Sequence, residues 1–93
     1  MNLFFEWDVA KARLNSKKHN VDFEEAATVF ADDFSLTYPD PDHSADEERY
    51  MTFGLTINGR YLVVAHTDRG DKIRIISARE MTRGERNYYE EIR

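Results

Sequence analysis

The residues best placed for chemistry are two arginines on one strand-like stretch. Residues 71–79, DKIRIISAR, follow a turn-like DRGD, and strand alternation places Arg74 on the opposite face from Ile75. An arginine in mid-strand has a rigid position, and its planar guanidinium can hold a phosphate through two hydrogen bonds. The alternative is that Arg74 pairs with a carboxylate or covers apolar surface with its stem. Arg79 has the same alternatives, with Glu85 as its expected partner.

Three further cations are candidates for the same site. His19 and Lys18 end a helix expected over residues 9–19, where a histidine that titrates near physiological pH lies beside a second cation. The alternative is a favourable interaction of both side chains with the helix dipole. Arg49 is the third cation, and a cross-strand ion pair with Asp68 is its alternative. The sequence leaves these alternatives open.

The remaining histidines and two tyrosines are weaker candidates. His66 is expected on the core face of the sheet, where a hydrogen-bonded structural histidine is more common than a catalytic one. His43 lies in the acidic loop at residues 39–48, which lacks the spacing of an EF-hand and is therefore expected to be a solvated loop. Tyr88 and Tyr89 could stack on bases, but their helical spacing places at least one of them in the core.

Helices are expected near both ends of the chain. Asp8 is a good N-cap for the helix at residues 9–19, and Asn20 tolerates the left-handed conformation that ends a helix. A second helix of about ten residues is expected after Asp22, which forms a capping-box pattern with Glu25. This second helix has one apolar stripe, formed by Phe23, Ala26, Ala27 and Phe30. Both helices are expected to cover the face of the sheet that contains Phe53 and Val64.

The middle of the chain alternates with a period of two, which predicts strands. A first strand is expected over residues 3–7, followed by an antiparallel meander of four strands from about Phe34 to Arg79. Asn58-Gly59 predicts a two-residue type I′ hairpin. The resulting register pairs Leu55 with Leu62, Phe53 with Val64 and Met51 with His66, and a turn at Arg69-Gly70 pairs His66 with Ile73, Val64 with Ile75 and Ala65 with Arg74. The expected core face is Met51, Phe53, Leu55, Leu62, Val64, His66, Ile73 and Ile75.

The opposite face of this sheet is too mixed to be plain solvent surface. Its expected members are Tyr50, Thr52, Thr56, Tyr61, Val63, Ala65, Thr67, Lys72, Arg74 and Ile76, and such a composition suits a groove that receives a partner. A last helix follows, with Thr82 and Glu85 in a second capping-box pattern. The predicted fold class is α+β, in one domain over residues 1–93.

Composition restricts the function classes. The chain has 93 residues, no cysteine and no long apolar run, which predicts a soluble, cytoplasmic protein with no membrane segment, no disulfide and no thiolate metal site. The net charge is −5, and residues 21–58 contain ten acidic residues against one basic residue. Any affinity for a polyanion is therefore confined to patches.

Several separated motifs give the chain a resemblance to the BrnT toxin family. They are FEWD at residues 5–8, the N-x-x-K-H pattern of Asn15, Lys18 and His19, FEEAATVFAD at 23–32, DPDH at 40–43, RIISARE at 74–80, and the later Arg83, Glu85 and Tyr89. They occur in order and cover nearly the whole chain. The resemblance implies a RelE-like fold and a ribonuclease without metal or other cofactor that stops translation. It also implies a BrnA antitoxin with a ribbon-helix-helix domain, in a two-plus-two heterotetramer that contacts DNA only through the antitoxin.

Metal-independent RNA cleavage needs a base, an acid and cations directed at the phosphate. The eligible residues are Arg74, Arg79, Arg49, Lys18 and His19. The antitoxin is expected to cover the same face, by contact with Tyr50, Tyr61, Val63, Arg74 and Ile76, because interfaces concentrate aromatic residues and arginine. The alternative is a catalytically weak or inactive module that binds the antitoxin and contributes to regulation of its operon.

Overall fold

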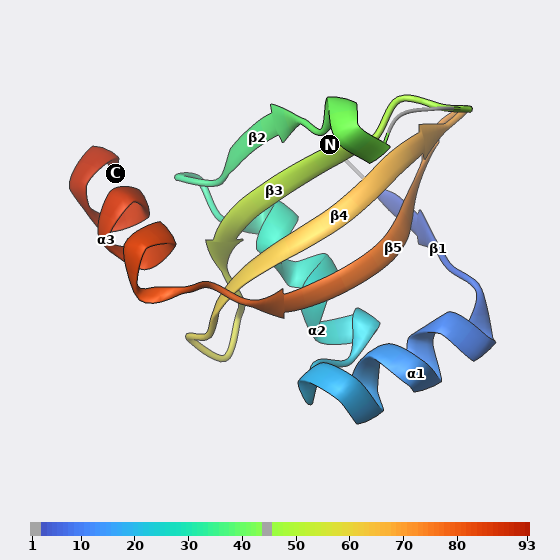
Figure 1. The fold of residues 1–93 in the computed structure, drawn as a ribbon, viewed down its shortest axis with the longest axis horizontal. Helices are drawn as coiled ribbons and strands as arrows, with labels where there is room; N and C mark the ends of the chain where they lie inside the picture. Colours follow the sequence, from blue (N-terminus) through green and yellow to red (C-terminus); the bar gives the residue numbers. More distant parts are fainter. Residues whose placement is uncertain (1–2, 44–45) are drawn as a thin grey trace.

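The computed structural model describes residues 3–43 and 46–93, and its fold is α+β, as predicted (Figure 1). The elements are β1 (Phe4–Glu6), α1 (Val9–His19), α2 (Phe23–Ala27), the 3-10 helix η1 (Thr28–Ala31), β2 (Leu36–Pro39), the 3-10 helix η2 (Pro41–His43), β3 (Tyr50–Leu55), β4 (Tyr61–Arg69), β5 (Lys72–Glu80) and α3 (Arg83–Ile92). The strand order is β1-β5-β4-β3-β2. Strands β2 to β5 form the expected antiparallel meander, but β1 pairs with β5 in parallel, so the prediction of an antiparallel sheet was wrong for this edge.

Helix α1 has the predicted bounds, whereas the expected start of α2 was partly wrong. The Asp8 carboxylate accepts a hydrogen bond from the Lys11 N–H at 3.1 Å, and Asn20 has a φ of 56°. Asp22 makes no capping hydrogen bond, because its carboxylate accepts from the Ser16 hydroxyl at 2.8 Å. The helix also tightens to the 3-10 form after Ala27.

The β3–β4 turn differs from the predicted type I′ hairpin. Thr56 and Arg60 close a three-residue loop, with the Thr56 N–H donating to the Arg60 carbonyl at 2.8 Å. Gly59 has a φ of 82°, whereas Asn58 is not among the described residues with positive φ. A type I′ turn requires positive φ at both positions, and a loop with one such residue is a three-residue hairpin. Leu55 therefore pairs with Tyr61, one residue away from the expected partner.

A one-residue slip reverses the faces of β3, because side chains alternate across a strand. Thr52 and Gly54 face the helices, and the predicted core positions Met51, Phe53 and Leu55 lie on the other face. The face predicted for Thr52 and Thr56 was also wrong, since Thr52 is hydrogen-bonded to the core residue His66 and Thr56 donates to Glu25 of α2. A Cβ atom at Gly54 would lie 2.9 Å from Val29 Cγ1, so only glycine fits beneath η1.

The β4–β5 pairing also differs from the prediction, but with a smaller consequence. His66 pairs with Ile75 and Thr67 with Arg74, a shift of two residues that leaves the faces unchanged. The side chains of Arg74 and Ile75 therefore point to opposite faces of the sheet, as predicted. Beyond this point a bulge places one extra residue in β5 between the partners of Ala65 and His66. Ile76 and Ser77 both line the cavity on the face away from α2.

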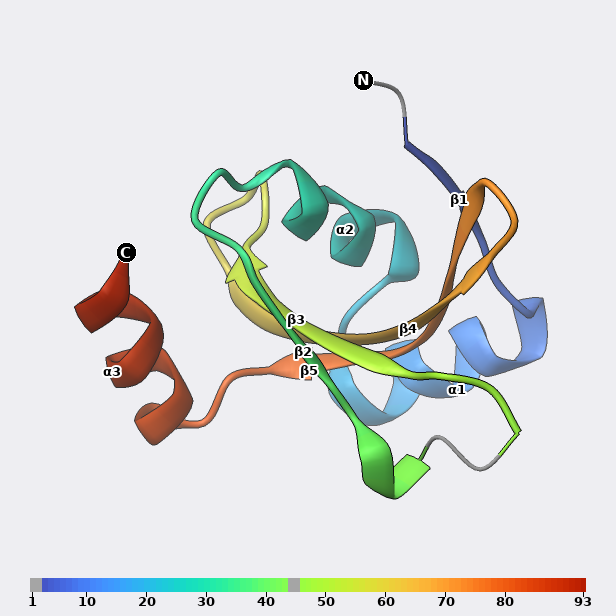
Figure 2. The same cartoon turned by 90° about the horizontal axis from the view of Figure 1, so that it is seen from above.

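The core lies between the sheet and the helices α2 and η1. Its buried members are Val21, Phe23, Ala26, Val29, Leu62, Val64, Ile75 and Ala78. Figures 1 and 2 show α2 against the sheet, α1 beside β5, and α3 set apart from both at the far side of the molecule. The Tyr89 hydroxyl of α3 donates to Asp32, and the Tyr89 ring meets Tyr61 edge-on at 5.9 Å. None of the helices within the described residues has the length and apolar character needed to cross a bilayer.

Candidate functional site

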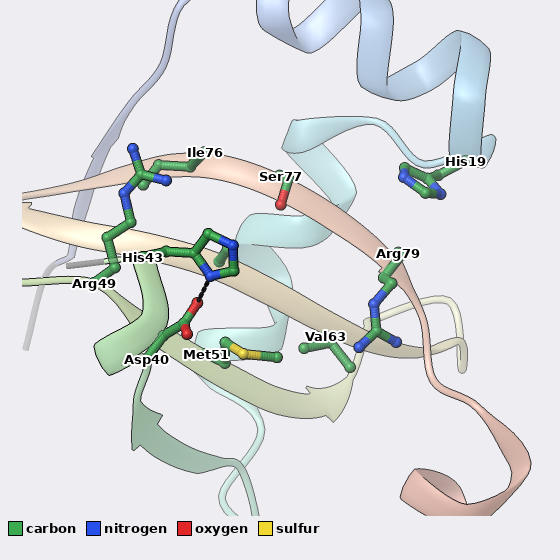
Figure 3. Close-up of a pocket in the computed structure, with 10 residues that line it drawn as sticks. His19, Asp40, His43, Arg49, Met51, Val63, Ile76, Ser77 and Arg79 are labelled. Atoms are coloured by element: carbon green, nitrogen blue, oxygen red, sulfur yellow. Dashed lines mark hydrogen bonds and ion pairs between the residues drawn. The ribbon is translucent and has the colours of Figure 1, made fainter. Parts of the chain in front are cut away.

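A cavity of about 310 Å³ lies on the face of the sheet away from α2 (Figure 3). Its lining residues are His19, Asp40, His43, Arg49, Met51, Val63, Ala65, Ile76, Ser77 and Arg79. They come from the end of α1, the β2–η2 segment, the position just before β3 and strands β3 to β5, so the fold assembles the cavity from distant parts of the chain. Three of the five predicted catalytic residues, His19, Arg49 and Arg79, are brought together here.

The cavity also contains a histidine–carboxylate pair. His43 Nδ1 lies 3.0 Å from Asp40 Oδ2, and the 3-10 turn η2 places residues three apart on one side. A carboxylate accepts a hydrogen bond from Nδ1–H, which leaves Nε2 of the neutral imidazole as a proton acceptor. The His43 side chain is 68% exposed, so Nε2 is accessible to a large substrate, whereas Asp40 is 16% exposed. The described part of this loop is largely exposed, as expected, and the structure adds a specific contact between His43 and Asp40 that the sequence analysis did not anticipate.

The sequence did contain a signal for His43. Asp40 and His43 are the first and last residues of the DPDH motif, and their spacing of three suits a 3-10 turn. The acidic composition around the motif directed the interpretation to a cation site or solvated loop instead. No group of three or more metal-ligating side chains gathers within residues 3–43 and 46–93.

Arg79 is fixed at one side of the cavity by helix α3. Its Nη1 and Nη2 atoms donate to the two carboxylate oxygens of Glu85 at 2.8 Å and 3.0 Å. Glu85 also closes the predicted capping box, since Glu85 Oε1 accepts from the Thr82 N–H at 2.8 Å. The hydrogen bonds from Arg79 and Thr82 lower the pKa of Glu85 to about 2. Figure 3 shows Arg49 on one side of His43 and Arg79 on the other.

Two predicted catalytic residues lie outside the cavity lining. Arg74 Nη1 donates to Glu6 Oε2 at 2.9 Å across the β5–β1 pair, which matches the alternative interpretation of a structural ion pair. Lys18 lines a neighbouring groove that shares His19 with the cavity. A catalytic role for Arg74 or Lys18 stays a prediction.

The predicted antitoxin-binding residues do not form one open surface. Tyr50 lies on the helix side of the sheet, where its ring stacks on His66 at 5.8 Å, so its predicted face was wrong. Tyr61 is covered by α3, since its hydroxyl donates to Glu90 at 3.0 Å and the Arg86 guanidinium lies 4.0 Å from its ring centroid. Val63 and Ile76 line the cavity, and Arg74 is paired as described. His66 is buried, and its Nε2 atom shares a hydrogen bond of 2.7 Å with the Thr52 hydroxyl, as expected of a structural histidine.

The fold and the site define a small α+β protein with a cavity lined by two histidines, two arginines and one aspartate. A model of the family described as the ribonuclease toxin BrnT of type II toxin-antitoxin systems matches residues 7–85. The chain belongs to this family, which confirms the resemblance. It is also similar to the crystal structure of the Brucella abortus ribonuclease toxin BrnT, with 22% identity over 88% of this chain and 100% of that chain and a TM-score of 0.69. At that identity the likeness shows the fold alone. A search of curated proteins found no match.

Proposed function

We propose that this chain is a metal-independent ribonuclease that cleaves RNA in the cavity and thereby inhibits translation. The observation that carries the proposal is the Asp40–His43 pair in a cavity that also holds His19, Arg49 and Arg79. Transesterification of RNA requires a base, an acid and fixed positive charge, and these five side chains supply all three.

The proposed reaction starts at His43. Its Nε2 removes the proton of a ribose 2′-hydroxyl, and the 2′-oxygen attacks the adjacent phosphorus. Asp40 stabilises the imidazolium that forms, because its carboxylate holds Nδ1–H at 3.0 Å. The bond from phosphorus to the 5′-oxygen breaks, and His19 donates a proton to that oxygen. The products are a 2′,3′-cyclic phosphate and a 5′-hydroxyl.

The two arginines act on the charge of the phosphate. Negative charge on the phosphoryl oxygens increases in the transition state, and guanidinium groups held in place stabilise it without reorganisation. Glu85, which the α3 capping box positions, holds Arg79 in place through two hydrogen bonds. Arg49 lies on the opposite side of His43, so a phosphate in the cavity has a cation on either side (Figure 3).

The test is cleavage of single-stranded RNA by the purified chain in excess chelator. The parent is expected to give 2′,3′-cyclic phosphate ends and to slow growth when expressed alone. His43→Gln should lower the rate by roughly a hundredfold to ten-thousandfold, the usual contribution of a general base. Asp42→Asn is the matched control, because this exposed side chain belongs to the same turn but does not line the cavity. Equal rates for the parent and a folded His43→Gln protein would overturn the proposal.

We further propose that the antitoxin is a BrnA-like ribbon-helix-helix protein, which leaves its DNA-binding domain free in a two-plus-two assembly and inhibits by covering the cavity mouth. Ile76 supports this position of the antitoxin, because its apolar side chain is half-buried and lines the cavity. Ile76→Asp should weaken the complex in calorimetry, since a buried contact becomes a desolvated charge. Unchanged affinity would place the antitoxin elsewhere. The apolar cavity of about 260 Å³ between Phe53 and Tyr88 is then the next candidate, and Tyr88→Asp tests it.

A second candidate function is a weak or inactive antitoxin-binding module that contributes to operon regulation. The net charge of −5 and the compensation of Arg79 by Glu85 favour this alternative. In that case the parent cuts no RNA but still binds the antitoxin. The RelE-like assignment of the fold is a proposal as well, and the meander of strands β2 to β5 with two N-terminal helices supports it.

A further inference from the structure

A groove of about 210 Å³ lies between α1 and β5 and is lined by Lys11, Leu14, Asn15, Lys18, His19, Ile76 and Ser77. Three of these residues, His19, Ile76 and Ser77, also line the cavity that contains His43. The two hollows therefore meet along the bulge of β5. Figure 3 shows Ile76 and Ser77 on this strand with His19, at the end of α1, beyond them.

The groove has one basic and exposed wall. Lys11, Leu14 and Lys18 are separated by three and four residues, so they form one stripe along α1. All three side chains are exposed, and Leu14 retains 67% of its accessible surface. The apolar Leu14 side chain lies between the two ammonium groups along the helix.

The charge of α1 contrasts with the rest of the protein. The helix contains four lysines and arginines and no acidic residue, although the net charge of the chain is −5. A polyanion that approaches this acidic protein is therefore attracted to α1 more than to the central part of the sequence. Because the basic stripe leads into the cavity, the attraction is directed at the candidate active site.

The walls of the groove are held at a fixed separation. The buried Asn15 side chain donates to the Ala78 carbonyl at 2.9 Å and accepts from the Ala78 N–H at 3.0 Å. It also donates to the Val21 carbonyl at 3.1 Å. Among the residues that the structure describes, β1 pairs with β5 only at residues 72–74, so the Asn15 amide takes the place of a neighbouring strand at Ala78. Helix α1 is thereby fixed beside the bulge.

We infer that this groove is a subsite for single-stranded RNA flanking the scissile bond. Lys11 and Lys18 each bind a phosphate of the strand, and Leu14 offers an apolar surface to a base or ribose between them. The inference rests on the proposed ribonuclease function and adds to it a route by which the substrate enters the cavity. It also assigns Lys18 to substrate binding in place of a role in the chemical step.

The experiment measures binding of the full chain to a single-stranded oligonucleotide eight residues long that carries a 2′-deoxy sugar at every position and is not cleaved. The Lys11→Ala/Lys18→Ala protein should bind roughly 20-fold more weakly at 100 mM salt. The slope of log K against log salt should fall by about 1.4, since each phosphate contact on a single strand contributes about 0.7. A dinucleotide should lose less affinity, because it does not reach the groove.

Arg13→Ala is the matched control. Arg13 lies on the same helix and is exposed, but at 100° per residue it lies on the opposite side from Lys11 and Lys18 and outside the groove lining. Combining Arg13→Ala with Arg83→Ala on α3 gives a double variant whose net charge equals that of the lysine double variant. An equal loss of affinity and slope in the lysine and arginine double variants would overturn the inference.

The outcome is separable from that of the ribonuclease proposal. If the parent cleaves no RNA but the lysine double variant binds the oligonucleotide more weakly than the arginine double variant does, the subsite holds and the nuclease proposal fails. If the parent cleaves RNA and the lysine variant binds the oligonucleotide as tightly as the parent does, the subsite is overturned and the nuclease proposal holds. Circular dichroism of each variant checks that the fold is intact.

Discussion

Arg74 and Arg79 lie at the two ends of β5, on the same face of the sheet, and differ in what surrounds them. Arg74 pairs with Glu6 of the neighbouring strand, away from the cavity. Arg79 pairs with Glu85 of α3 and lines the cavity with His43. Both arginines have a carboxylate partner, so pairing alone does not distinguish a structural from a functional arginine. We expect their positions relative to the histidines of the cavity to do so.

The largest expected difference between the two ends is in activity. Arg79→Ala should lower the rate of RNA cleavage by about a hundredfold or more, because a fixed cation beside the transition state is lost. Arg74→Ala should change the rate far less, since Arg74 lies outside the cavity lining. Steady-state cleavage and growth at matched protein abundance measure both. A greater loss in the folded Arg74→Ala protein would return the catalytic assignment to Arg74.

The next difference concerns how each end of β5 is supported. The Arg74 end pairs with β1, whereas the Ala78 end depends on the Asn15 amide. Asn15→Ala leaves the outward N–H and carbonyl of Ala78 without this partner, and the loss should lower the free energy of unfolding by about 2 kcal/mol. Chemical denaturation measures the change. Arg13→Ala, an exposed position on the same helix, is the control, and an equal effect there would remove the special role of Asn15.

The smallest expected effect is the pH dependence of the Arg79–Glu85 pair. The pKa of Glu85 is lowered from 4.5 to about 2, first by Arg79 and then by Thr82. A lowered carboxylate pKa stabilises the fold at pH values above 4.5, and the contribution is lost as the pH falls from 4.5 towards 2. The Glu85→Gln protein should therefore be less stable than the parent at pH 7 by about 1 kcal/mol, the value for a solvent-screened pair. The difference should shrink below pH 4.5 in denaturation curves, and a constant difference would contradict the assignment.

Local hydrogen bonds were predictable where no other group competed for them. Asp8 caps α1, and Thr82 with Glu85 caps α3, because each pattern involves residues three apart. Asp22 has the same pattern with Glu25, but Ser16 of the preceding helix takes its carboxylate. The prediction failed there because a contact from outside the motif replaced the local one.

Which side chains of β3 face the helices depended on the backbone conformation at Asn58-Gly59 and on the packing of Gly54 against η1. The Asn58-Gly59 pair indicates a turn, and a turn is present, but only Gly59 has positive φ and the loop has one residue more than expected. The close approach of Val29 to Gly54 then fixes which side of β3 faces η1. Neither fact is visible in the alternation of Met51, Phe53 and Leu55.

The sequence by itself determined the fold class, the bounds of α1, the antiparallel meander and the set of cations from which a site is built, because these follow from periodicity and from contacts between near neighbours. Only the tertiary structure decided which of these cations lie together in one cavity. The Asn15–Ala78 contact spans 63 residues, and the β5 bulge turns Ile76 and Ser77 into the shared wall of the cavity and the groove. Such contacts depend on the packing of elements far apart in the chain, which no local pattern encodes.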